Sequence, residues 1–156
     1  MQNVEKKSNK IIRLTIKNIM KVFLLIIFRV KVIGQENIPE GACVICPKHL
    51  SNWDPPVIVA CTKRKINMMA KDSLFKNGLI RWLAKIFGIF PVKRGMKDLE
   101  AIKNALRILK KQEAVAIYPE GTRKGLEKGL KPKNGAVLIA IKAKAPIVPV
   151  RYTRKF

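Results

Sequence analysis

The chain has 156 residues, of which 48% are hydrophobic, so it is long enough to bury one core and too apolar for an intrinsically disordered protein. Its 33 Lys and Arg residues against 10 Asp and Glu give a formal charge of +23, which predicts an anionic partner without choosing among a membrane, an acidic carrier protein and a nucleic acid. We expect no cleavable signal sequence, and three cysteines then favour a reducing cytoplasm over a disulfide framework.

The N-terminal residues 1–29 predict a basic amphipathic helix, most regular from Lys10. Its cations recur at steps of three and four residues and form one stripe: Lys10, Arg13, Lys17 and Lys21. The wholly apolar run 22–28 is much shorter than the roughly 20 residues that cross a bilayer. We therefore expect a membrane-associated helix at the interface, with its stripe toward the lipid headgroups. The alternative is a helix packed on the domain's own core.

Residues 30–156 predict an α/β domain in which strands alternate with helices. The expected strands are 30–33, 42–46, 66–70, 90–92, 114–118 and 147–152. The expected helices are 57–61, 73–87, 98–111 and 135–144, with Asp98 as the cap of the third. This alternation is typical of a largely parallel (mixed) sheet flanked by helices, whose functional groups collect on loops at strand ends.

The lone histidine lies just after the expected strand 42–46 and begins an H-x-x-x-x-D motif, from His49 to Asp54. An imidazole can take a proton near neutral pH, and a carboxylate on its far ring nitrogen fixes the tautomer and stabilises the imidazolium. The alternative is a solvated pair on a surface loop. Because no Ser or Cys nucleophile is obvious, the histidine would have to activate a hydroxyl of the substrate.

The loop after the expected strand 114–118 reads Tyr-Pro-Glu-Gly-Thr-Arg, from Tyr118 to Arg123. The planar fork of Arg123 matches phosphate oxygens, and Gly121 lets backbone amides approach a ligand closely. This loop could cradle a phosphate. It could equally be a polar turn in which Glu120 pairs with a lysine.

Three further segments are less informative. Lys93 and Arg94 precede a glycine turn, either as part of a ligand site or as a solvated pair. Prolines in 145–150 predict a strand at a sheet edge or bulge, which at most walls an apolar channel. Cys43 and Cys46 form a C-x-x-C within an expected strand, where residues three apart face opposite sides, so a redox or metal role is not expected.

Together and in this order, the four segments at 49–54, 90–95, 118–123 and 145–150 resemble the glycerolipid acyltransferase family, and within it the bacterial 1-acyl-glycerol-3-phosphate (lysophosphatidate) acyltransferases. The resemblance covers about residues 30–150 and implies that His49 is the general base for the acceptor hydroxyl and that Asp54 orients it. It also implies an acceptor site that binds the phosphate. The residues that match this site are Arg94, Glu120, Gly121, Thr122 and Arg123.

The resemblance further implies transfer of a fatty acyl group to the 2-hydroxyl of lysophosphatidate, at the cytoplasmic face of the inner cell membrane. The donor would be acyl-CoA or an acyl carrier protein, with anionic membrane lipids as partners and with no metal, tightly held cofactor or nucleic acid. The alternatives are an acyltransferase for glycerol-3-phosphate or another lysolipid, and a non-catalytic basic module that binds membranes or nucleic acid.

Two features depart from the family pattern. Lys48 stands where many members have a small or amide residue, and this cation could lower the pKa of the imidazole or hold an anionic substrate. The chain also stops six residues after Val150, where most members continue with further strands and helices, so one interpretation is a shortened domain.

Overall fold

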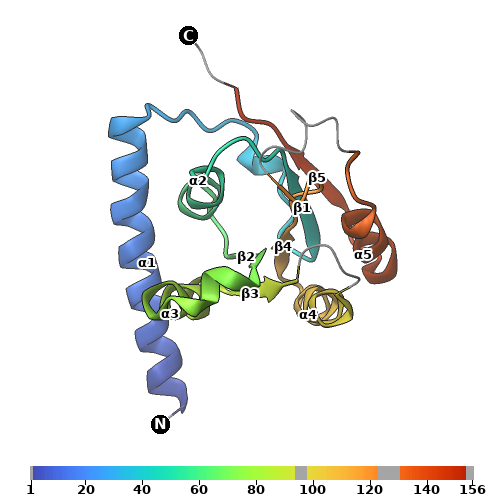
Figure 1. Ribbon diagram of the computed structural model, residues 1–156. Coiled ribbons are helices and arrows are strands. Elements are labelled where there is room, and N and C mark those ends of the chain that lie inside the picture. The colour runs from blue at the N-terminus through green and yellow to red at the C-terminus, as the bar shows by residue number, and fades with distance from the viewer. Residues whose placement is uncertain (1, 94–97, 123–130, 154–156) are drawn as a thin grey trace.

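A twisted parallel sheet forms the centre of the molecule (Figure 1). The computed structural model describes residues 2–93, 98–122 and 131–153, with side chains from Ser8 onward. The strands are β1 (Cys43–Pro47), β2 (Ile66–Lys71), β3 (Ile89–Val92), β4 (Ala114–Ala116) and β5 (Ile147–Val150). They lie in the order β3-β2-β4-β1-β5, and every pairing between neighbours is parallel. The predicted α/β class and parallel sheet are confirmed.

This order brings the loops of interest together. β1 pairs with β4 through the registers of Cys43 with Ala114 and Ile45 with Ala116. Because parallel neighbours end at the same edge of a sheet, the loop after β1 and the loop after β4 emerge side by side.

Helices cover both faces of the sheet (Figure 1). One face carries α2 (Asp54–Cys61) and α3 (Gly78–Phe87), with α1 (Gln2–Ile27) along their outer side; the other face carries α4 (Leu99–Lys110) and α5 (Gly135–Ala143). Short 3-10 helices occupy Gln35–Asn37 and Asp72–Lys76.

Each face of the sheet has its own apolar core, and β1 contributes side chains to both cores. Val44 packs with α4 and α5, while Cys43 and Ile45 pack on the side of α2. Cys46 packs with the α4 and α5 core, so the two cysteines of the C-x-x-C face opposite sides, as their spacing predicts. Pro91 in β3 and Pro149 in β5 lie in the two edge strands of the described sheet, where a missing backbone N–H costs no pairing.

The helix ends explain two boundaries. The Asp98 side chain caps α4 by accepting a hydrogen bond from the Ala101 N–H at 3.0 Å, as expected. The single helix expected over 73–87 is wrong. Asn77 caps α3 by accepting from the backbone N–H groups of Leu79 and Ile80, so the chain forms a 3-10 turn before α3 begins.

The strand expected at 30–33 is also wrong. β1 has a partner strand on each side, β4 and β5, so it leaves no place for this segment beside it. Residues 30–33 instead form an irregular connection from α1 toward the sheet. Val30 packs beside Leu24, Ala60 and Cys61 in a small separate core, whereas Ile33 is 82% exposed. A short apolar run therefore packs here against helices, which local patterning does not distinguish from pairing in a sheet.

α1 packs against the domain with part of its basic stripe turned inward, whereas the stripe was expected to face the lipid headgroups. Arg13 and Lys17 are half-buried, and the Lys17 ammonium donates to the carbonyl oxygen of Thr62 at the end of α2. Burial lowers the pKa of this ammonium, and Arg13 and Lys21 lower it further. The stripe of cations therefore does not face outward as a unit.

The outward side of α1 is instead apolar. Ile19, Val22 and Ile26 are 66%, 55% and 69% exposed and recur at helical spacing along one side. Within the described residues, no helix combines the length and apolar character needed to cross a bilayer. The division into a helix at 1–29 and a domain at 30–156 stays a prediction.

Candidate active site

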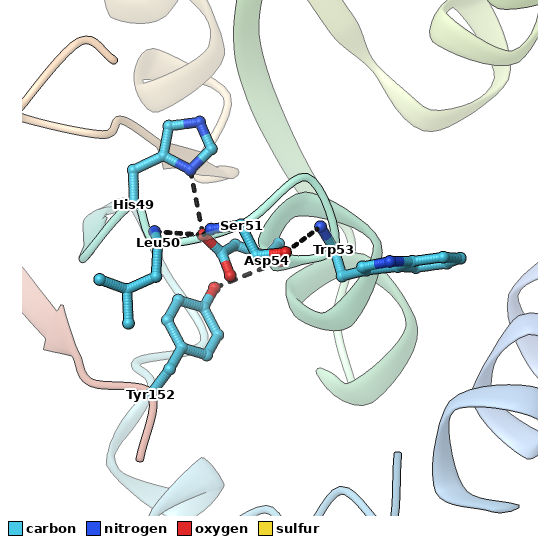
Figure 2. Close-up of polar contacts among 6 residues, drawn as sticks. All are labelled: His49, Leu50, Ser51, Trp53, Asp54 and Tyr152. Carbon is cyan, nitrogen blue, oxygen red and sulfur yellow. Dashed lines mark hydrogen bonds and ion pairs between the residues drawn. The ribbon is translucent and has the colours of Figure 1, made fainter. Parts of the chain in front are cut away.

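The two ends of the H-x-x-x-x-D motif meet (Figure 2). His49 lies in the loop after β1 and Asp54 at the first residue of α2, and the His49 Nδ1 is 3.0 Å from the Asp54 Oδ2. His49 is 9% exposed and Asp54 5%. The predicted contact is therefore present, and the pair is buried rather than solvated.

The carboxylate of Asp54 is held from several directions. Its Oδ2 accepts hydrogen bonds from the backbone N–H groups of Leu50 and Ser51, both at 2.6 Å. Asp54 also begins α2, whose N-terminus favours a negative charge, and Pro55 and Pro56 follow without N–H groups that would need partners. The loop and helix therefore supply a fixed anion beside the imidazole.

This arrangement selects one form of the imidazole. An ionised carboxylate can only accept, so the Nδ1 of His49 carries the proton that is donated to Asp54. The other nitrogen, Nε2, then has a free lone pair, and Figure 2 shows it on the far side of the ring from Asp54. The pair can thus accept a proton at Nε2 and stabilise the imidazolium that results.

Two tyrosines complete the surroundings of the pair. The Tyr118 ring lies against the His49 ring with their centroids 4.4 Å apart and their planes tilted by 36°. The Tyr152 hydroxyl donates to the main-chain oxygen of Asp54 at 3.2 Å. Burial raises the pKa of both phenols, which therefore stay protonated at neutral pH. Sequence reasoning gave Tyr118 no role and passed over Tyr152.

The loop after β4 lies beside this pair, as the strand order requires. Its turn is closed by the Gly121 N–H donating to Tyr118 O at 3.0 Å and by the Lys133 N–H donating to Pro119 O at 2.8 Å. Gly121 has φ of +64°, a left-handed conformation that glycine adopts at little cost. Thr122 follows it and is half-buried.

Glu120 is 9% exposed, and its Oε2 has no hydrogen-bond partner among the described residues. The sequence also allowed an ion pair between Glu120 and a lysine, and no such pair is present among the described residues. An unpaired carboxylate oxygen at a buried position is costly, and it fits a site that a hydroxyl-bearing ligand completes.

Two predicted site residues, Arg94 and Arg123, lie outside the described residues. Their contacts with an acceptor phosphate therefore stay a prediction. Lys93 is described, and its backbone N–H donates to the Asp98 carboxylate at 2.7 Å. Lys48 is exposed, and its backbone N–H donates to Val150 O at 3.1 Å.

The cysteines do not supply an alternative nucleophile. Burial raises the pKa of the thiols of Cys43, Cys46 and Cys61, and the Glu120 carboxylate raises that of Cys46 further. A thiol rather than the reactive thiolate is present at neutral pH. The imidazole of His49 therefore remains the proton acceptor to which the geometry points.

The loop of the H-x-x-x-x-D motif also contacts α1. The Trp53 ring, one residue before Asp54, lies 5.1 Å from the Phe28 ring and 6.1 Å from the Phe23 ring, centroid to centroid. These three rings are 44–46% exposed. An apolar surface at the end of α1 thus continues to the edge of the H-x-x-x-x-D loop.

Comparison with known proteins places this site in a family. The model of the family described as Acyltransferase matches residues 29–153, most of the chain. A 1-acyl-sn-glycerol-3-phosphate acyltransferase of Bacillus subtilis is 38% identical over 138 residues, covering 86% of this chain and 68% of that protein. One of Streptococcus pneumoniae is 36% identical over 119 residues, covering 75% of this chain and 43% of that one.

The fold has a counterpart among solved structures. The crystal structure of the 1-acyl-sn-glycerophosphate (LPA) acyltransferase PlsC from Thermotoga maritima matches with a TM-score of 0.72 and 26% identity, covering 93% of this chain and 59% of that one. The chain thus spans between 43% and 68% of the length of these three relatives. It belongs to the acyltransferase family.

Proposed function

We propose that this protein transfers a fatty acyl group from a thioester to the 2-hydroxyl of lysophosphatidate and so forms phosphatidate. The observation that carries the proposal is the buried His49–Asp54 pair, in which Nε2 has no hydrogen-bond partner among the described residues. The family membership and the names of the relatives support the reaction and the acceptor.

The reaction proceeds through the acceptor hydroxyl, because the site offers a base and no thiolate. Nε2 of His49 takes the hydroxyl proton as the oxygen attacks the thioester carbonyl, and Asp54 stabilises the imidazolium. The tetrahedral intermediate then collapses, its carbon–sulfur bond breaks, and Nε2 returns the proton to the departing thiolate. The products are the new ester and the free thiol.

The loop after β4 forms the acceptor site in this proposal. Glu120, whose Oε2 has no hydrogen-bond partner among the described residues, accepts a hydrogen bond from a hydroxyl of the glycerol rather than facing the phosphate, because two anions repel. Gly121 and Thr122 line the same turn, and Arg94 and Arg123 neutralise the phosphate. No metal or tightly held cofactor takes part, and the co-substrate is acyl-CoA or an acyl carrier protein.

The protein works at a lipid surface, as a peripheral protein of the cytoplasmic face. The outward side of α1, with Ile19, Val22 and Ile26, enters the interface, and exposed cations such as Lys10 and Lys21 meet anionic headgroups. The contact between Trp53 and the end of α1 then brings the catalytic loop to the same surface.

The experiment that tests the proposal measures acyl transfer from labelled acyl-CoA or acyl carrier protein to lysophosphatidate in anionic vesicles. His49→Ala should abolish transfer without loss of vesicle binding, because it removes the base and leaves α1 intact. Retained turnover in this variant would remove His49 from the mechanism. Competition between lysophosphatidate, glycerol-3-phosphate and a lysolipid without phosphate identifies the acceptor, and preference for the last removes the proposed roles of Arg94 and Arg123.

A further inference from the structure

The imidazole of His49 is held at two places in the described structure. Its Nδ1 hydrogen-bonds to Asp54 at one edge, and the Tyr118 ring covers one face. The side chain makes no other hydrogen bond with the described residues. A single hydrogen bond restrains one atom of the ring and not the plane of the ring, so the direction of Nε2 depends on what packs against the face.

Tyr118 is built as a rigid support. It lies two residues after the end of β4, β4 pairs with β1, and the Tyr118 ring packs into the core on the side of α2. Its main-chain oxygen accepts from the Gly121 N–H, which closes the next turn. The ring therefore cannot follow the imidazole if that side chain rotates, and it keeps the imidazole in one orientation.

The contact also has an electrostatic consequence. The face of an aromatic ring carries negative potential and attracts a cation placed against it. The imidazole is neutral before the reaction and becomes a cation as it takes the proton of the hydroxyl. A ring 4.4 Å away on one face thus favours the charged form more than the neutral form, which lowers the barrier rather than strengthening substrate binding.

We infer that Tyr118 is a positioning residue for the reaction, whose aromatic ring holds the imidazole of His49 with Nε2 toward the acceptor and stabilises the imidazolium. This inference rests on the proposed function of His49. The ring, and not the hydroxyl, carries the effect, because the ring lies against the imidazole and no hydrogen bond joins the Tyr118 hydroxyl to His49 or Asp54.

Two substitutions separate the ring from the hydroxyl. Tyr118→Phe keeps the ring and should keep kcat within about threefold. Tyr118→Leu removes the ring and should lower kcat by about tenfold or more, from lost orientation and lost cation–π attraction, while KM for lysophosphatidate and acyl-CoA changes by less than about twofold. The assay uses the full chain in anionic vesicles. Phe87→Leu, which removes a buried aromatic ring in α3, is the matched control and should leave kcat unchanged.

A second measurement does not depend on activity. His49 is the only histidine in the chain, so its imidazole proton resonances are identified without assignment. The Tyr118 ring should shift them upfield, and the shift should persist in Tyr118→Phe and disappear in Tyr118→Leu, provided that circular dichroism shows a folded variant.

The outcomes distinguish the inference from the proposed function. If Tyr118→Leu is folded and keeps wild-type kcat while His49→Ala is inactive, the inference fails and the proposed function stands. If Tyr118→Phe loses as much kcat as Tyr118→Leu, the hydroxyl is the functional group and the inference is overturned. If His49→Ala keeps its turnover, the proposed role of His49 as the base fails and the inference about Tyr118 fails with it, while the NMR shift still reports whether the two rings touch.

Discussion

The Asp54 carboxylate both contacts the His49 imidazole and holds the loop between the two residues in place. Its Oδ2 accepts from the His49 imidazole and from the backbone N–H groups of Leu50 and Ser51. Asp54→Asn keeps an oxygen for the two amides but loses the negative charge and lets the amide donate to Nδ1. We therefore expect kcat to fall on the order of 10²- to 10⁴-fold with little change in thermal stability.

Asp54→Ala is the companion variant for stability. It leaves two backbone amides of a half-buried loop without their acceptor, so unfolding should become easier by about 1–3 kcal/mol for each amide that water does not reach. Steady-state kinetics and thermal unfolding of both variants check this division. A fully active Asp54→Asn protein would show that the charge is not needed.

The junction of α3 and β3 depends on a glycine. Gly88 ends α3 with φ of +70°, and a Cβ there would lie 2.2 Å from the Asn67 Oδ1. That Asn67 side chain is itself buried and donates to Glu113 and to Ala114 O. Gly88→Ala should therefore lower the free energy of unfolding by about 1–3 kcal/mol, and the midpoint of thermal unfolding by several degrees.

Gly78, at the start of α3, is the matched control for this prediction. It has no atom within 4 Å of a Cβ position, and its φ is not in the left-handed region. Gly78→Ala should leave stability unchanged or raise it by up to about 1 kcal/mol, because alanine favours the helix. Equal losses in the two variants would show that the close approach of Asn67 does not matter.

Taken as a whole, the molecule combines a charge of +23 with exposed apolar side chains along α1. If this side of α1 enters the lipid interface, Ile19→Ser with Ile26→Ser should weaken binding to anionic vesicles by about tenfold or more, since each buried isoleucine contributes about 1.5–3 kcal/mol. Added salt should weaken the binding of wild type and variant alike, because it screens the cations. Co-sedimentation with vesicles measures both effects.

Ile141 provides the control surface for this experiment. It lies on α5, on the other side of the sheet, and is 70% exposed, as much as Ile26. Ile141→Ser should leave vesicle binding unchanged. An equal loss in this variant, or no loss in the α1 variant, would contradict the assignment of α1 as the lipid-facing side.

Most elements and the contact between His49 and Asp54 have local causes, which a sequence pattern can reveal. Alternating or periodic apolar residues predicted β1 to β5, α4 and α5 close to their observed bounds, and the Asp98 cap is a contact between residues three apart. His49 and Asp54 meet within one turn, so their spacing allowed the contact, but it left a solvated pair on a surface loop as the alternative. The roles of Arg94, Arg123 and the acceptor loop came from resemblance to a family, and they stay predictions.

What the sequence by itself determined is therefore the α/β class, the strands β1 to β5 with the helices α4 and α5, and the short separation of His49 from Asp54, because short-range sterics and hydrophobic periodicity decide these. Only the tertiary structure decided which side of α1 faces outward, that 30–33 packs on helices, and that Tyr118 lies against His49. These contacts join residues far apart in the chain. They depend on the strand order and on which segments compete for the same buried surface, and a local sequence pattern specifies neither.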